Sequence, residues 1–133
     1  MNAWSQSRPR VFAASAAIRL LFGEPGAERI ESRLGGACIS ALSYHDVLTK
    51  LRELGVDTTL AEKLIDELDL EIVPFGREQA VLASMLRPLT RAAGLTFGDC
   101  TCLALSRMRN AIALTADSAW RELKLGIGIE IIR

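Results

Sequence analysis

Three aspartates are the side chains whose type and position in this sequence could do chemistry: Asp46, Asp99 and Asp117. Each lies close to a short apolar segment of the kind that forms a buried strand, and Asp117 follows such a segment after only two residues. Clustered carboxylates repel one another, and such clusters are retained mainly where a hard cation neutralises them. The three positions taken together favour a divalent metal site.

Each aspartate also has a purely structural interpretation at the start of a helix. Asp46 stands three residues after Ser43, which is the spacing of a capping box. Asp99 would be favoured by the dipole of a helix that begins near it, and Asp117 could cap the short helix that contains Trp120. Both interpretations stay open for each residue taken alone, and the shared placement of the three beside strands favours the metal site.

The elements that must position these aspartates alternate between strands and helices. Short apolar runs predict five strands, at 10–14, 37–41, 71–75, 111–114 and 129–132. Apolar spacing and capping residues predict helices between them, at 15–22, 25–34, 43–54, 58–68, 77–93, 97–109 and 116–123. A kink or break is expected at Pro88. The alternation predicts a central parallel sheet with helices on both faces, where ligands bind beyond the carboxyl ends of the strands.

Length and composition narrow the class of protein. The 133 residues fit one domain, with residues 1–9 as a flexible start. A content of 50% hydrophobic and 24% charged residues excludes a disordered or collagen-like chain. The formal net charge is zero, so no overall basic field indicates a nucleic-acid partner. Only three of the 16 basic residues are Lys, however, and the Arg that makes up the rest is favoured where phosphate is bound.

Cysteine usage and hydropathy point to a soluble cytoplasmic protein. Cys38, Cys100 and Cys102 cannot all pair, and the absence of a Cys-x-x-Cys pair together with a single His argues against a zinc site. They are predicted to be buried, reduced thiols. The apolar stretch 11–18 is interrupted by Arg19 and lacks a clean cleavage region, so neither a signal peptide nor a membrane span is expected.

Four blocks of the sequence resemble the motif blocks of PIN-domain ribonucleases, and most closely those of the VapC-type toxins of bacterial toxin–antitoxin pairs. The blocks are 11–16 (VFAASA), 42–47 (LSYHDV), 95–99 (LTFGD) and 114–117 (LTAD). The resemblance covers residues 10–133, and it implies a three-layer α/β/α sandwich with a mostly parallel sheet of about five strands. It also implies a metal-dependent endoribonuclease, in which Mg²⁺ or Mn²⁺ activates water and stabilises charge on the scissile phosphate.

The same resemblance implies roles for individual residues. Asp99 and Asp117 match the third and fourth acidic positions of the family, and Thr115 matches a hydroxyl residue that helps to hold metal or water. Asp46 stands where the family usually has Glu, so its carboxylate is one methylene shorter and could bind metal through water. The implied catalytic set is therefore Asp46, Asp99, Asp117 and Thr115, with the three aspartates as metal ligands.

The first acidic position of the family is missing. The first block normally carries an Asp after two apolar strand residues, and this chain has Ala13 there. Loss of a residue that only supports a ligand already lowers metal affinity or activity by about 10–100-fold, so loss of a direct ligand predicts impaired cleavage. An engineered substitution and natural divergence both account for this alanine.

Candidate RNA-binding residues surround Asp99 in the sequence: Arg87, Arg91, Arg107 and Arg109. They could bind phosphates or could form a solvated helix face. Trp4 and Trp120 could stack on bases, although packing is preferred for Trp120. His45 could carry a proton, although a surface position is preferred.

The family resemblance also implies partners, and it leaves a second function open. It implies a homodimer and an antitoxin whose segment crosses the acidic groove, with an Arg reaching into the carboxylates. The alternative function is a catalytically inactive PIN-like module that binds RNA or an antitoxin. A phosphate-accepting, receiver-like domain is a more distant alternative, because Lys124 is poorly placed for it.

Overall fold

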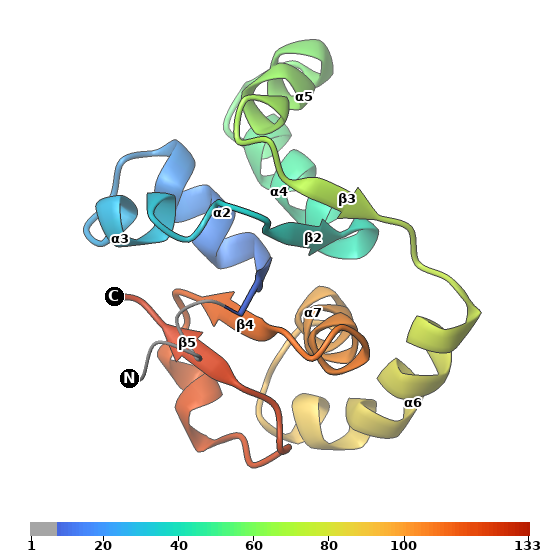
Figure 1. Ribbon diagram of the computed structural model, residues 1–133. Coiled ribbons are helices and arrows are strands. Elements are labelled where there is room, and N and C mark those ends of the chain that lie inside the picture. Colours follow the sequence, from blue (N-terminus) through green and yellow to red (C-terminus); the bar gives the residue numbers. More distant parts are fainter. Residues whose placement is uncertain (1–7) are drawn as a thin grey trace.

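The computed structural model describes residues 8–133; residues 1–7, which include Trp4 and most of the expected flexible start, lie outside the described residues. Strands and helices alternate as predicted (Figure 1). In chain order the elements are β1 (Arg10–Phe12), α2 (Ala14–Leu21), α3 (Ala27–Glu31), β2 (Cys38–Ser40), α4 (Ala41–Glu53), α5 (Thr58–Asp66), β3 (Glu71–Val73), α6 (Arg77–Ala92), α7 (Phe97–Met108), β4 (Ile112–Thr115), the short 3₁₀ helix η1 (Ser118–Glu122) and β5 (Ile129–Ile131).

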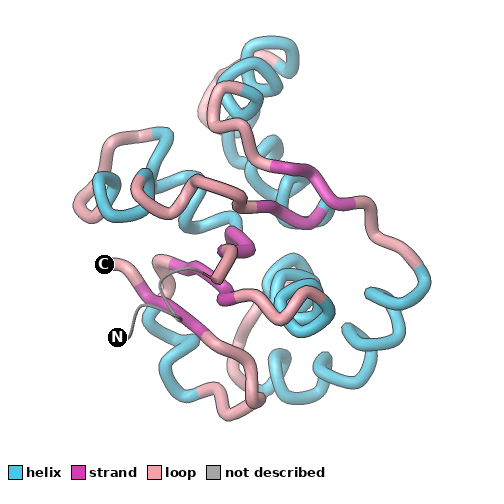
Figure 2. The backbone as a smooth tube through the Cα atoms, viewed as in Figure 1, coloured by secondary structure: helices cyan, strands magenta, loops and turns pink. Residues whose placement is uncertain are grey.

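The strands form one sheet in the order β3-β2-β1-β4-β5, and every neighbouring pair is parallel. Figure 2 shows the strands in magenta among the surrounding helices in cyan. Alternate side chains of the central strand β1 point to opposite faces, as the pleat requires. Phe12 packs among residues of α2, α4 and α5, whereas Val11 packs among residues of α6 and α7. Helix α7 lies directly on the sheet and α6 covers it (Figure 1). The predicted α/β/α sandwich with a parallel five-stranded sheet is therefore confirmed.

Two helices begin earlier than the sequence predicts. Helix α4 begins at Ala41, because the Ser40 side chain accepts the backbone N–H of Ser43 at 3.2 Å and so caps the helix. The capping-box interpretation of Ser43 and Asp46 is therefore wrong. Helix α2 begins at Ala14 and not at Ser15, which leaves Ala13 at its N-cap position without a side-chain hydrogen bond.

Helix α6 runs without a break through Pro88, where a kink or break was expected. Proline lacks the N–H that would bond to the carbonyl four residues earlier, which here belongs to Ser84. Both Ser84 and Pro88 are exposed, so water can satisfy that carbonyl and the helix continues. At the other end of the chain, the helix predicted over 116–123 is the shorter 3₁₀ helix η1.

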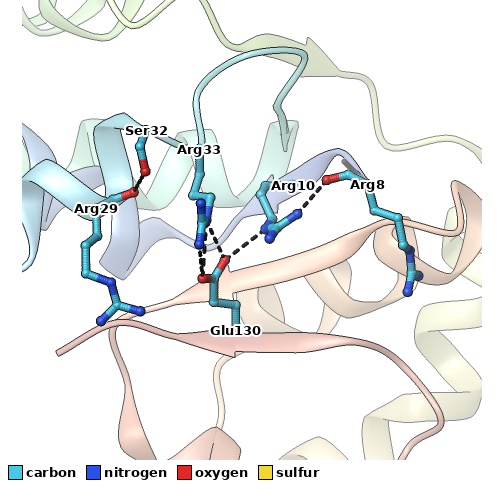
Figure 3. A network of polar contacts seen from close by, with 6 residues as sticks. All are labelled: Arg8, Arg10, Arg29, Ser32, Arg33 and Glu130. Carbon is cyan, nitrogen blue, oxygen red and sulfur yellow. Dashed lines mark hydrogen bonds and ion pairs between the residues drawn. The ribbon is translucent and has the colours of Figure 1, made fainter. Parts of the chain in front are cut away.

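A buried ionic network fastens the last strand to the rest of the sheet (Figure 3). Glu130 on β5 accepts from Arg10 of β1 and from Arg33, which follows α3, with both nitrogen–oxygen distances 2.9 Å. Burial by itself would raise the pKa of Glu130, but the hydrogen bonds and charges of the two guanidinium groups outweigh it and hold the pKa below its usual range. The carboxylate is therefore neutralised inside the fold.

The core contains the residues whose burial the sequence predicts. Cys38, Cys100 and Cys102 are buried free thiols, and Trp120 is packed in the core with 1% of its surface exposed. Among the described residues, no helix combines the length and the apolar character needed to cross a bilayer.

Candidate active site

Asp99 lies in the first turn of α7, where a capping box holds its carboxylate. The Asp99 N–H donates to Thr96 Oγ1 and the Thr96 N–H donates to Asp99 Oδ2, both at 3.1 Å. The structural interpretation of Asp99 as a helix-start residue is thus correct, and the cap fixes the direction of the side chain. Because Oδ2 is the oxygen that the cap uses, Oδ1 is left for another partner.

The environment of Asp99 disfavours its negative charge. Burial raises the pKa of Asp99, the hydrogen bonds to Thr96 offset part of that rise, and the carboxylates of Asp117 and Asp46 raise it further. Both other candidate aspartates therefore act on Asp99 through their charge. This is the electrostatic arrangement of a site that a cation would stabilise.

Asp46 lies in the second turn of α4, and its carboxylate packs against the backbone of Gly98 in α7. A methyl group added at Gly98 would overlap the Asp46 carboxylate, which would then have to move away from its present position. Asp46 also contacts the ring of its neighbour, with His45 Nδ1 and Asp46 Oδ1 3.1 Å apart. The His45 side chain is 71% exposed, which agrees with the surface position preferred for it.

A buried network of hydroxyl groups joins the starts of α4 and α7. Ser43 Oγ and Thr101 Oγ1 both donate to the Gly98 carbonyl, at 3.1 and 2.8 Å, and Ser40 Oγ lies 2.9 Å from Thr101 Oγ1. All three hydroxyl side chains are buried, and a fully satisfied buried network is rigid. The network therefore fixes the helix that carries Asp46 relative to the helix that carries Asp99.

Thr115 is the last residue of β4 and Asp117 lies two residues after the strand, and hydrogen bonds within the turn use most of their polar groups. Thr115 Oγ1 accepts the Asp117 N–H at 3.0 Å and lies 3.1 Å from Ser15 Oγ, which in turn accepts the Ala116 N–H at 3.0 Å. Asp117 caps η1 by accepting the N–H of Ala119 at 2.9 Å, as its structural interpretation predicts. Asp117 is exposed.

Ala13 lies at the centre of this edge of the sheet. It is fully buried, its N–H donates to the Leu114 carbonyl at 2.9 Å, and it follows the central strand β1 directly. Its methyl group supplies neither a cap for α2 nor a ligand for a cation. An Asp at this position would have an oxygen able to cap α2.

The acidic cleft, as we call it, opens between α2, α4 and the start of α7 with a volume of about 370 Å³. It is lined by Ala14, Ile18, Asp46, Thr49, Lys50, Glu53, Thr96, Gly98 and Asp99. Asp46 and Asp99 thus share the cleft, whereas Asp117 does not line it. Lys50 and Glu53 were not predicted as site residues, although they stand four and seven residues after Asp46, which places them on the same helix face.

The residues present do not complete a site for a divalent metal ion. Within the described range 8–133, no three His, Cys, Asp or Glu side chains lie close enough together to hold one ion. Carboxylate oxygens are the right chemistry for Mg²⁺ or Mn²⁺, and Asp46, Asp99 and Asp117 supply them. The position at which the family resemblance implies a further acidic ligand, at the end of β1, is occupied by Ala13.

The four candidate arginines do not form one rim around Asp99. Arg107 and Arg109 lie at the opposite end of α7, a helix of 12 residues and therefore about 18 Å long. Arg109 makes a two-pronged ion pair with Glu71, at 2.7 and 3.1 Å, and Arg107 donates to the Leu125 carbonyl. Arg87 and Arg91 remain near the start of α7, beside Phe97.

Comparison with known proteins agrees with this architecture. A model of the family described as "PIN domain" matches residues 11–125. The chain belongs to the PIN domain family. The match runs from β1 past η1, so it contains Ala13 and all three candidate aspartates.

Solved structures share the fold at low sequence identity. The chain is similar to one in the VapBC2 structure from Rickettsia felis bound to a promoter DNA fragment, with 14% identity, TM-score 0.73, and coverage of 93% of this chain and 98% of that one. The DNA-bound VapBC structure from Salmonella typhimurium gives 16% identity with the same TM-score and coverage. VapBC-5 from Mycobacterium tuberculosis gives 20% identity, TM-score 0.55 and coverage of 95% and 98%. No curated protein matches the sequence.

Proposed function

We propose that this PIN domain is a VapC-type endoribonuclease whose cleavage of RNA is impaired because Ala13 replaces an acidic ligand. The observation that carries the proposal is the environment of Asp99. Burial and the carboxylates of Asp117 and Asp46 disfavour its negative charge, and the nearby residue 13 is a buried alanine with no oxygen to offer a cation. Carboxylates that are not neutralised by positive neighbours destabilise the folded state, and such an arrangement fits a site that binds a cation. Divalent metals are the expected cofactors, as Mg²⁺ or Mn²⁺.

The position of Ala13 supports the same proposal. It follows the central strand, and its neighbour β4 ends in the Thr115–Asp117 turn. In parallel sheets, ligands bind beyond these carboxyl ends. An aspartate at residue 13 would therefore stand beside the turn that carries Asp117 and the helix that carries Asp99.

The test compares the chain with its Ala13→Asp variant on single-stranded and structured RNA, with Mg²⁺ or Mn²⁺. We expect cleavage by the variant at least 10–100-fold above that of the parent, and its loss in EDTA. Calorimetric titration with Mn²⁺ gives an independent readout, in which the variant should bind more tightly. Ala13→Asn is the matched control, because it can cap α2 but adds no charge. Equal cleavage by parent and variant would contradict our account of Ala13.

The alternative is a PIN module that binds RNA or a protein partner without cutting. It is favoured by the absence, within residues 8–133, of three donors close enough to hold a metal. If Ala13→Asp cuts no RNA with any metal and binds no Mn²⁺, this alternative replaces the nuclease.

An antitoxin and a second copy of the chain are the partners we propose. The similar structures are of VapBC assemblies, and the acidic cleft offers Asp46, Asp99 and Glu53 to a basic side chain of an antitoxin. An exposed apolar stripe on α6, formed by Val81, Met85 and Leu89 at 55–65% exposure, is a candidate surface for a homodimer. A Met85→Glu variant should then be monomeric in light-scattering measurements. Buried free thiols agree with a cytoplasmic location.

A further inference from the structure

A second groove lies on the other flank of the α7 start, and we call it the aromatic groove. It has a volume of about 490 Å³, within the range of sites that hold small ligands. Its walls include Phe75, Phe97, Arg87, Pro88 and Arg91. None of the residues that line it is acidic, in contrast to the acidic cleft.

The aromatic residues of the groove are held in a fixed arrangement. The rings of Phe75 and Phe97 meet edge to face, with centroids 5.9 Å apart and an interplanar angle of 73°. The guanidinium of Arg87 lies over the Phe97 ring, 5.9 Å from its centroid, and donates to the Leu95 carbonyl at 3.0 Å. Phe97 is nevertheless 46% exposed, so much of its surface remains open to a ligand.

The charge of the groove identifies the kind of ligand. Arg87 and Arg91 both line it, with no carboxylate among the other lining residues. Aromatic rings stack on nucleic-acid bases of any sequence, and Arg binds phosphate. A flat aromatic ligand that carries negative charge satisfies both features, and a nucleotide is such a ligand.

We propose that the aromatic groove binds one nucleotide of single-stranded RNA, with the base against Phe97 and its phosphate against Arg91. The proposal deepens the proposed function and rests on it for the choice of RNA as ligand. Phe97 and Asp99 are two residues apart in the first turn of α7, so they point to different sides of the helix. An RNA strand that leaves the groove therefore passes over the start of α7 into the acidic cleft.

The test measures binding of a fluorescently labelled ten-nucleotide oligouridine by anisotropy, in EDTA so that no cleavage occurs. We expect Phe97→Ala to weaken binding by about fivefold or more and Phe97→Trp to retain it, because stacking needs only an aromatic face. Arg91→Gln should weaken binding and lower the slope of log K against log salt by about 1. Phe22→Ala is the matched control, because Phe22 is also exposed, at 47%, and does not line the groove.

Several outcomes would overturn the proposal. Absence of RNA binding by the parent chain is one, and an equal loss in the Phe22 and Phe97 variants is another. Unchanged RNA affinity with a change from dimer to monomer in Phe97→Ala would assign the groove to a contact between copies. Because this assay needs neither metal nor cleavage, its result is separable from that of Ala13→Asp, and Arg91→Gln keeps the test valid if Phe97→Ala folds poorly.

Discussion

Glu130 and Asp99 are partly buried carboxylates of the same protein in opposite circumstances. Glu130 lies between two guanidinium groups, and its pKa is lowered (Figure 3). Asp99 has other carboxylates as its charged neighbours, and its pKa is raised. Along residues 8–133, no Lys or Arg comes within ion-pair distance of it. Neighbours within the fold thus neutralise the charge of Glu130, whereas the neighbours of Asp99 disfavour its charge.

The largest effect expected from this contrast is on cleavage. In the Ala13→Asp background, Asp99→Asn should reduce RNA cleavage by more than about 100-fold, because it removes one of the carboxylates proposed to hold the metal. Single-turnover rates on one RNA, measured with Mn²⁺, would check this. Glu71→Gln is the control, since Glu71 on β3 pairs with Arg109 beyond the far end of α7. Retention of full activity in the Asp99→Asn variant would remove Asp99 from the site.

The second-largest effect expected is a loss of stability when Glu130 is replaced. Glu130→Gln should lower the free energy of unfolding by about 3 kcal/mol at pH 7, because it takes the carboxylate away from two guanidinium groups, one of them on the buried Arg10. Urea denaturation measures the change. Glu71→Gln, which breaks the exposed pair with Arg109, should cost less than about 1 kcal/mol.

The pH dependence of the stability lost in Glu130→Gln tests whether that loss is electrostatic. The folded pKa of Glu130 is lowered, so its stabilisation is present above the unfolded value of about 4.3 and is lost as pH falls through the folded pKa. The difference between parent and Glu130→Gln should therefore shrink in acid. A difference that stays constant down to pH 2 would show that packing, and not charge, is lost.

A third effect is expected at the uncapped start of α2. Ala13→Ser or Ala13→Asn should stabilise the fold by about 1 kcal/mol, because either side chain can accept an N–H of the first turn. Ala13→Asp should gain less at pH 7, since its charge adds to the repulsion around Asp99. Thermal unfolding at pH 7 and pH 4 separates the two contributions. A gain of the same size from Ala13→Val, which has no acceptor, would contradict the capping explanation.

The smallest effect expected is a small gain in stability when the charge of Asp99 is removed. Because its folded pKa lies above the unfolded value of about 3.9, its charge opposes folding at neutral pH and ceases to do so in acid. Asp99→Asn keeps the oxygen that accepts from Thr96 and should raise stability at pH 7 by no more than about 1 kcal/mol, with no gain below pH 3. Denaturation across this range would show it. A loss of stability at pH 7 would mean that the cap needs the charge.

The fold could be predicted from the sequence because its signals are local. Alternating apolar runs and helical spacings are readable in windows of ten residues, and they placed every strand within one or two residues of its position. The errors lie in the helices: the break expected at Pro88, the type and length of η1, and the starts of α2 and α4. At a helix start, neighbouring capping candidates compete. Ser40 and Ser43 are both good caps, and only the geometry of the chain after β2 decides for Ser40.

The candidate site was less predictable because it depends on contacts between distant residues. Nothing in the spacing of Ser40 and Thr101 shows that they meet, although their hydroxyl groups lie 2.9 Å apart. The four arginines near Asp99 in sequence form two pairs, which lie at opposite ends of α7 because residues about ten or more apart in a helix are far apart in space. Lys50 could have been found, since helical spacing from Asp46 places it on the same face.

The order of the strands has a consequence for folding during synthesis. The central strand β1 is synthesised first, and its partner at Ile112 is made more than a hundred residues after Arg10. At ribosomal rates of about 5–20 residues per second, β1 waits for about 5–20 s with one edge uncovered. A nascent chain interrupted before β4 has no means to complete its sheet. The edge formed by the ends of β1 and β4 is therefore complete only after β4 has been synthesised.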